Sequence, residues 1–278
     1  MKHSFLEIVC FLLFLIVIQT QLTTILKERG LAERLQSDQL LSDTFREMKL
    51  SDESICDLNI LSAQTNLEFG ELLTILYAGR NGSLTRVPSR WSAEQVIGWK
   101  RFLTQYNENG YRAFCDAYGA IWNDVVCFPV AESGMVFENS WMFERTYGGT
   151  RGHEGTDLIP PENVSGYYRI LSMTDGVVEQ IGWLPKGGYR IGIRSPSGGY
   201  FYYAHLDSYS RSFQVGDPVA AGEVLGTMGD TGYGEEGTRG KFAVHLHLGI
   251  YIRTEQQEEL SVNPYWILRS FRQQEKAE

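Results

Sequence analysis

The stretch from Val244 to Ile250 constrains the fold more than any other part of this sequence, because apolar and polar residues alternate along it. In a β-strand, successive side chains point to opposite faces, so the apolar residues face a core while His245 and His247 share the other face. The two imidazoles then lie about 7 Å apart along the strand. This pattern predicts a sheet with one buried face and one accessible face.

Histidine is the commonest metal ligand and the usual general base near neutral pH. The chain has five histidines, and His3 lies in the apolar N-terminal segment. Apart from His3, His245 and His247, the chain has His153 and His205, which lie in stretches that can converge on the face that carries His245 and His247. Taken alone, the strand pair is equally well explained as two solvated positions on an amphipathic strand.

Composition excludes one class of partner. A length of 278 residues allows one large or two modest domains, and 43% hydrophobic residues with 29 glycines are typical of a turn-rich globular protein. The net charge of −9 gives no basic surface. We therefore expect no nucleic-acid partner.

The N-terminus carries an unbroken apolar run, Ile8 to Ile18, which approaches membrane-spanning length when its apolar flanks are included. The run follows Met1–Lys2 directly, a position typical of a targeting segment, and no small-residue cleavage site follows it. The sequence predicts that residues 1–26 are an uncleaved signal anchor. The protein would then be a single-pass protein of the cell membrane, with its body outside the cytoplasm.

Two observations leave alternatives to this anchor. A signal-peptide core or a buried helix has a run of the same length. Lys27, Arg29 and Arg34 also outnumber Lys2, which favours the opposite orientation under the positive-inside rule, although that rule weakens for long translocated domains.

Residues 27–130 are predicted to be helical, because apolar residues recur at helical spacing as far as about Asp124. Asn66 is a candidate N-cap for a helix that Gly79 ends, and Ser92 with Gln95 forms a candidate capping box for the next helix. We expect Asn109–Gly110 to end that helix. The region shows no catalytic constellation, so it is interpreted as a spacer, a surface for a protein activator, or packing for the next domain.

The cysteines exclude a thiolate zinc knuckle, because no Cys-x-x-Cys occurs. Cys115 and Cys127 can form a disulfide outside the cell, and free buried thiols explain them equally well.

The composition changes beyond about Phe128, where short stretches rich in glycine, aromatic and β-branched residues are separated by turn residues. Strands are predicted at 176–182, 189–193 and 200–205. Residues 131–278 are therefore expected to form a mainly antiparallel β domain. The fold class is α+β, with an anchor and a helical region before this domain.

His153 and Asp157 lie four residues apart, as in the His-Glu-x-x-His zinc helix, but Asp157 replaces the second histidine and Gly155 is a poor helix former. A loop that enters a strand is the better prediction. His153, Asp157 and one strand histidine would give two nitrogens and one oxygen, a ligand set that suits zinc and leaves a fourth position for water.

The chain resembles the zinc metallopeptidases of the M23 type, the LytM or lysostaphin-like group. The resemblance rests on three elements in order, and on the runs 175–178, 215–226 and 229–232 between them. The elements are His153-x-Gly155-x-Asp157, Tyr203-Ala204-His205-Leu206 and His245-Leu246-His247. It covers roughly Trp141 to Pro264 and leaves the helical region unexplained.

The resemblance implies that His153, Asp157 and His247 bind one zinc ion, while His205 and His245 act on the substrate as catalytic residues. Zinc in such a site activates water and polarises the peptide carbonyl. The two histidines take the proton of the water, orient it, or donate to the oxyanion and the leaving amine. Glu154 matches no catalytic position and is interpreted as solvated.

The sequence departs from the family pattern at two loops. Tyr233 to Phe242 forms an insertion, followed by Ala243–Val244 where the family often has Gly-Pro, and the loop at 160–168 is long. Both are expected to flank the site and to alter the substrate groove.

The resemblance implies a zinc metalloendopeptidase that hydrolyses peptide bonds in bacterial cell-wall peptidoglycan. The alternative is a catalytically silent, membrane-anchored scaffold or binding protein in cell-wall or septal assembly. All five functional positions are intact, but the helical region could still cover the site. A lipoyl or biotinyl carrier, suggested by the glycine-rich run at 216–226, is excluded because Thr227-Met228-Gly229 offers no lysine.

Overall fold

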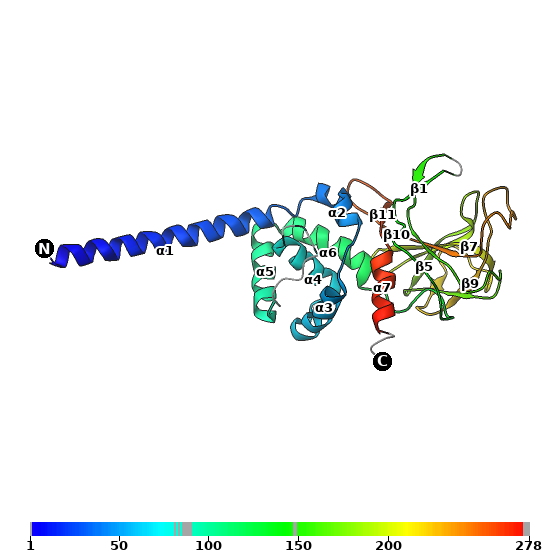
Figure 1. Ribbon diagram of the computed structural model, residues 1–278, viewed down its shortest axis with the longest axis horizontal. Coiled ribbons are helices and arrows are strands. Elements are labelled where there is room, and N and C mark those ends of the chain that lie inside the picture. The colour runs from blue at the N-terminus through cyan, green and yellow to red at the C-terminus, as the bar shows by residue number, and fades with distance from the viewer. Residues whose placement is uncertain (1, 81, 83, 85–90, 147–148, 275–278) are drawn as a thin grey trace.

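The computed structural model describes residues 2–80, 82, 84, 91–146 and 149–274. Figure 1 shows three parts in chain order: the helix α1 (Lys2–Ala32), which projects away from the rest, a cluster of shorter helices, and a β-sheet domain. The predicted α+β class is confirmed.

α1 is long and apolar enough to cross a membrane, with a mean hydropathy of 2.3 and no burial of its apolar window against the protein. The helix continues without a break past residue 26, where the anchor was predicted to end. Its last residues enter the helical region, where Ala32 is fully buried. The side-chain amide of Asn107 donates to the carbonyl oxygens of Ala32 and Leu35 at 2.8 and 2.9 Å and fixes this end of α1.

The helical region is built around α4, which packs closely on α6. The helices of this region, with one 3₁₀ segment, are η1 (Ser37–Leu41), α2 (Asp43–Arg46), α3 (Asp52–Thr65), α4 (Phe69–Gly79), α5 (Ala93–Tyr106) and α6 (Glu108–Trp122). α4 is buried on nearly all sides. Gly70 permits the close packing, because a Cβ there would lie 2.4 Å from the backbone nitrogen of Gly119.

The helix ends agree with the sequence in part. The capping box of Ser92 and Gln95 and the end of α4 at Gly79 are confirmed. The prediction for Asn66 was wrong: it ends α3 in the left-handed conformation (φ 55°), which asparagine tolerates, and Glu68 precedes α4. The break predicted at Asn109–Gly110 lies at Asn107, whose side chain accepts from the Gly110 amide and caps α6.

The main sheet of the β domain is antiparallel and has the strand order β11–β10–β7–β6–β5–β8. β3 also pairs with β10, and β9 pairs with β7 and β4, while β1 and β2 form a separate two-stranded sheet. The strands are β1 (Glu144–Arg145), β2 (Arg151–Gly152), β3 (Thr156–Leu158), β4 (Arg169–Leu171), β5 (Gly176–Leu184), β6 (Gly188–Arg194), β7 (Tyr200–Tyr209), β8 (Pro218–Val219), β9 (Val224–Met228), β10 (Leu246–Ile252) and β11 (Leu260–Val262), followed by the helix α7 (Tyr265–Gln274).

The three predicted strands correspond to β5, β6 and β7, and the alternating histidine stretch leads into β10. Leu246, Leu248 and Ile250 are fully buried, whereas His245 and His247 are only partly buried on the opposite face. The sheet therefore has the buried and accessible faces that the alternation predicts.

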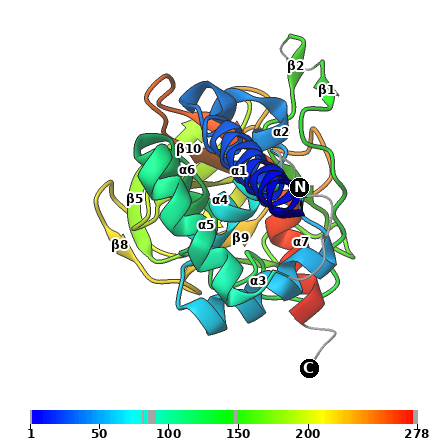
Figure 2. The same ribbon diagram turned by 90° about the vertical axis from the view of Figure 1, so that its left-hand side faces the viewer.

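The helical region and the sheet share one continuous hydrophobic core. Figure 2 shows the helices grouped around the inner end of α1, with the sheet behind them. Arg46 joins the two parts: its guanidinium donates to the carbonyl and hydroxyl oxygens of Ser261 at 3.0 and 2.9 Å and lies 5.2 Å from the centroid of the Trp141 ring. Its own carbonyl accepts from the Asn263 amide.

Cys115 and Cys127 are free thiols in this structure. The Cys127 thiol donates to the Ser172 carbonyl oxygen at 3.2 Å. Burial raises the pKa of the Cys115 thiol to about 11, so this side chain is a neutral part of the helical core.

Replacing Arg46 by alanine is expected to lower the free energy of unfolding by about 2–3 kcal/mol, because hydrogen bonds from a charged donor and a cation–π contact are lost. Urea unfolding of the full chain in detergent measures this. Arg112→Ala is the control, since Arg112 pairs with Glu108 at the exposed surface, where such pairs contribute roughly 0–1 kcal/mol. Equal losses would show that Arg46 does not join the two parts.

Candidate metal centre and active site

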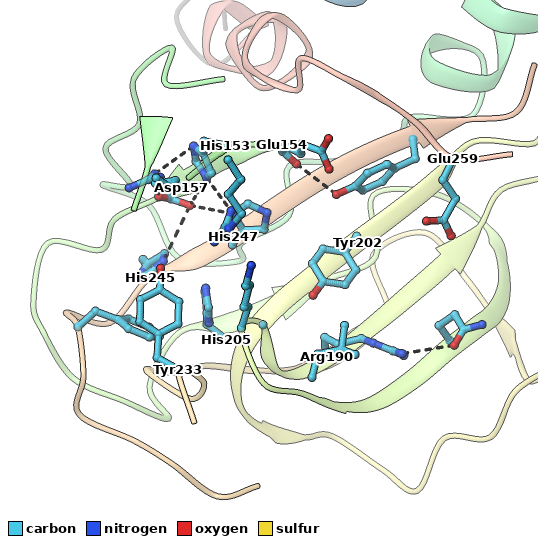
Figure 3. A pocket seen from close by; sticks show the side chains of 18 of the residues that line it. His153, Glu154, Asp157, Arg190, Tyr202, His205, Tyr233, His245, His247 and Glu259 are labelled. Carbon is cyan, nitrogen blue, oxygen red and sulfur yellow. Dashed lines mark hydrogen bonds and ion pairs between the residues drawn. The ribbon is translucent and has the colours of Figure 1, made fainter. Parts of the chain in front are cut away.

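The accessible face of the sheet carries a cavity of about 620 Å³. Its lining residues lie between Arg145 and Glu259, and all four predicted site histidines are among them. Tyrosine and arginine side chains extend the cavity away from the histidines (Figure 3). Among the described residues, none of the helical region lines the cavity.

His153, Asp157 and His247 converge at one end of this cavity. His153 Nε2, His247 Nδ1 and Asp157 Oδ1 lie 3.0 Å from one another in each of the three pairs. Two antiparallel strands produce this arrangement, because β3 and β10 place Asp157 directly opposite His247. His153 precedes β3 on a loop, as predicted.

The three side chains fit a zinc ion. A tetrahedral zinc with bonds of about 2.0–2.1 Å spaces its ligand atoms by roughly 3.3 Å, close to the spacing found here. Two imidazole nitrogens that face each other and one carboxylate oxygen cannot all be satisfied by donating protons to one another. A cation between them satisfies all three lone pairs.

The electrostatics of the cluster favour the protonation states that bind metal. Burial alone would raise the pKa of Asp157, but the hydrogen bonds of His153 and His247 outweigh it and hold this pKa far below its usual range. Burial lowers the pKa of His247, more than the attraction of Asp157 raises it. An ionised carboxylate and a neutral imidazole result.

Two neighbours orient the cluster. His153 Nδ1 lies 3.1 Å from the carbonyl oxygen of Ser140 and 3.0 Å from Arg145 Nη2. In the tautomer whose Nδ1–H donates to the Ser140 carbonyl, the lone pair of Nε2 is left for a metal. Arg145 donates to Asp157 Oδ2 at 2.6 Å and leaves Oδ1 for the cluster. The sequence pointed to neither residue, because neither the β1–β2 hairpin that carries Arg145 nor the loop that carries Ser140 has a periodic pattern.

The surroundings of Gly155 explain why a glycine lies between His153 and Asp157. A Cβ at this position would lie 2.5 Å from His247 Cε1 and 2.6 Å from the Leu248 carbonyl oxygen. Glycine is therefore required for β3 to pair with β10 while its loop passes over the His247 ring. Glu154 beside it is exposed, as predicted.

His205 and His245 lie together beside the cluster, with ring centroids 4.7 Å apart. Both are oriented in the same way, because His205 Nδ1 lies 2.7 Å from the Thr231 carbonyl oxygen and His245 Nδ1 lies 2.8 Å from that of Ala243. If both Nδ1–H groups donate to these oxygens, both Nε2 lone pairs are free. His245 Nε2 is 3.9 Å from Asp157 Oδ1.

Of the two loops that depart from the family pattern, only one lines the cavity. Tyr233 and Phe242, the ends of the insertion, pack their rings against His205 at centroid distances of 6.2 and 4.6 Å. Burial, with the neighbouring His245, lowers the pKa of His205 to about 3. The loop at 160–168 lies outside the cavity lining, and its Asn163 side chain accepts from the Val244 amide at 2.7 Å.

The sequence pattern of peptidase family M23 matches residues 151–264. An L-Ala–D-Glu endopeptidase of Bacillus subtilis (strain 168) is 38% identical over 160 residues, which are 57% of this chain and 48% of that protein. Endolysin 2638A of Staphylococcus phage 2638A is 26% identical over 130 residues, 43% of this chain and 26% of the endolysin. This chain thus spans about half or less of the length of these relatives.

A crystal structure similar to this one is that of a LytM-like glycyl-glycine endopeptidase from Ruminococcus gnavus. It has a TM-score of 0.75 and 44% sequence identity, and the match covers 87% of this chain and 96% of that chain. The overlap is larger than the β domain, so it includes much of the helical region as well.

Gly155→Ala is expected to lower the affinity for zinc roughly 10- to 100-fold, because the added methyl group displaces His247 or separates β3 from β10. Zinc titration of the metal-free chain against a competing chelator measures the change. Gly98→Ala is the matched control, since a Cβ on Gly98 meets no atom within 4 Å. Unchanged affinity in Gly155→Ala would show that His247 is not a ligand.

Proposed function

Since this chain belongs to peptidase family M23, we propose that it is a zinc-dependent endopeptidase that hydrolyses peptide bonds in bacterial cell-wall peptidoglycan. The observation that carries the proposal is the convergence of His153, Asp157 and His247 at 3.0 Å beside two further histidines in an accessible cavity. Such a site has both a place for a metal and groups that move protons next to it.

His153, Asp157 and His247 would hold the zinc ion. When bound, zinc supplies an acidified water and polarises the carbonyl of the scissile bond. The Ser140 carbonyl and Arg145 keep the ligand atoms aligned before any metal binds, so little reorganisation is required.

His205 and His245 are proposed as the catalytic residues that orient the water and transfer its proton. The separation of 3.9 Å between His245 Nε2 and Asp157 Oδ1 places this nitrogen beside the cluster, within reach of a group held there. With each Nδ1–H directed at a backbone carbonyl, His245 Nε2 can accept a proton and later return it to the leaving amine. His205, which burial keeps neutral, can use its Nε2 lone pair to accept a hydrogen bond from the water and orient it. The rings of Tyr233 and Phe242 limit the movement of both imidazoles and exclude water from them.

The names of the relatives support a cell-wall peptide as the substrate. The Bacillus protein is named for the L-Ala–D-Glu bond and the Ruminococcus protein for a glycyl-glycine bond. The test is to incubate the full chain in mild detergent with purified peptidoglycan and to measure new amino groups, with mass spectrometry to identify the bond. Chelation should stop the reaction and zinc should restore it.

A scaffold without activity is the less favoured reading. It requires the helical region to cover an intact site, and the cavity has no lining residue from the described part of that region. Zinc binding without any hydrolysis of peptidoglycan would nevertheless contradict the proposed enzyme.

His247→Ala is expected to abolish both zinc binding and hydrolysis, because two ligands remain of three. His245→Ala should retain zinc and lose roughly 10²- to 10⁴-fold in kcat, the usual contribution of a proton-transferring group. Metal content by atomic emission and kcat on peptidoglycan fragments separate the two effects. Glu154→Gln serves as the control, and equal metal loss in both histidine variants would contradict the assigned roles.

The N-terminal helix is proposed to hold the peptidase at the outer face of the cell membrane. The full chain should stay in the membrane fraction after a carbonate wash, because residues 5–26 expose apolar side chains along the helix. Deletion of residues 2–26 should release the protein. Recovery of the full chain in the soluble fraction would contradict the anchor.

A further inference from the structure

The cavity extends beyond the metal cluster into a second part that the proposed mechanism does not use. Its acidic side chains, Glu154 and Glu259, are exposed. Arg190 is the most deeply buried of the arginine, lysine, aspartate and glutamate residues that line the cavity. This buried wall of the cavity is therefore cationic, although the whole chain carries a net charge of −9.

Arg190 has a defined position relative to the metal cluster. His247 pairs with Ala204 on β7, and Arg190 lies on β6 opposite the bulge at Ala204 and His205. Arg190 thus lies two strands across from His247, roughly 10 Å between backbones. Figure 3 shows Tyr202 between the two residues, and the Tyr202 and His247 ring centroids are 6.0 Å apart.

The guanidinium of Arg190 is incompletely satisfied. Only 9% of the residue is exposed. Nη2 donates to the Gln180 side chain at 3.3 Å, while Nε and Nη1 are buried and have no hydrogen-bond partner among the described residues. A buried cation with unused N–H groups costs free energy, so a protein that retains one at a cavity wall has a use for it in binding.

The geometry points to Arg190 as the residue that binds a free carboxylate of the substrate peptide, an inference that rests on the proposed peptidase function. A guanidinium presents its N–H groups in one plane and matches a carboxylate through two parallel hydrogen bonds. The surrounding tyrosine rings, Tyr200 and Tyr202, strengthen such a pair by excluding water.

The position of Arg190 also limits where the carboxylate lies. The backbone separation of roughly 10 Å between His247 and Arg190 corresponds to the length of about three residues of extended peptide laid across the strands. The preferred substrate is therefore a peptide with an unamidated acidic residue within about three residues of the scissile bond. Arg190 determines specificity and has no part in bond cleavage.

The test uses the zinc-loaded full chain in detergent and two synthetic stem-type peptides. Both carry an uncleavable isostere in place of the scissile amide, and they differ only in a free carboxylate or a carboxamide on the acidic residue. Calorimetry is expected to show roughly 10- to 100-fold tighter binding of the carboxylate peptide. Arg190→Gln should remove this preference. Arg190→Lys should retain part of it, because lysine keeps the positive charge but lacks the planar fork that forms two parallel hydrogen bonds.

Arg194→Gln is the matched control, because Arg194 lies on the same strand but pairs with Glu179 outside the cavity. It should keep the full preference. Arg190→Gln should also melt no lower than the wild type, since it removes an unsatisfied buried charge. A marked fall in melting temperature would indicate a structural role for Arg190 and would count against the inference.

Equal affinities of the wild type for the two peptides would overturn the inference, and so would loss of the preference in Arg151→Gln but not in Arg190→Gln. The proposed function is tested separately with the cleavable peptides. Preference for the carboxylate without cleavage would refute the peptidase and support the carboxylate site. Cleavage of both peptides with equal binding would support the peptidase and refute the carboxylate site.

Discussion

The pairing of β3 with β10 is the constraint on which the rest of this structure depends. It places Asp157 opposite His247 across two adjacent strands and so fixes a carboxylate and an imidazole side by side. A shift of one residue in this register would turn Asp157 to the core face and destroy the cluster. The buried leucines at positions 246 and 248 oppose such a shift, since it would expose them. Core packing and the geometry of the candidate metal site therefore depend on the same pair of strands.

Much of this could be predicted from the sequence, because alternation along a strand is a local property. The accessible face of β10, the three strands before it and the loop entry of His153 follow from spacing alone. The identity of the cluster required a resemblance, since His153 and His247 are 94 residues apart and no local rule brings them together. Arg145, Ser140 and Arg190 were missed for a related reason. Each contacts side chains 8 to 13 residues away in the chain, and an isolated arginine or serine gives no periodic signal.

The helix ends show that a residue suited to cap a helix can be assigned to the wrong helix end when only the local sequence is considered. Asn66 is a good N-cap residue and also tolerates the left-handed conformation, and here it ends α3 instead of starting α4. Asn107 was overlooked in favour of the Asn-Gly pair two residues later, although its side chain serves two ends at once. It caps α6 and also holds the last turn of α1.

That double role of Asn107 has a mechanical consequence. α1 continues into the helical region without a flexible linker, because Asn107 is hydrogen-bonded to its last turn. Arg46 in turn connects the helical region to the sheet. If α1 spans a lipid bilayer, the distance between the cavity and that bilayer is fixed by the rigid connection of α1 to the folded protein. A peptidase held in this way would act only on peptides within a fixed distance of the bilayer.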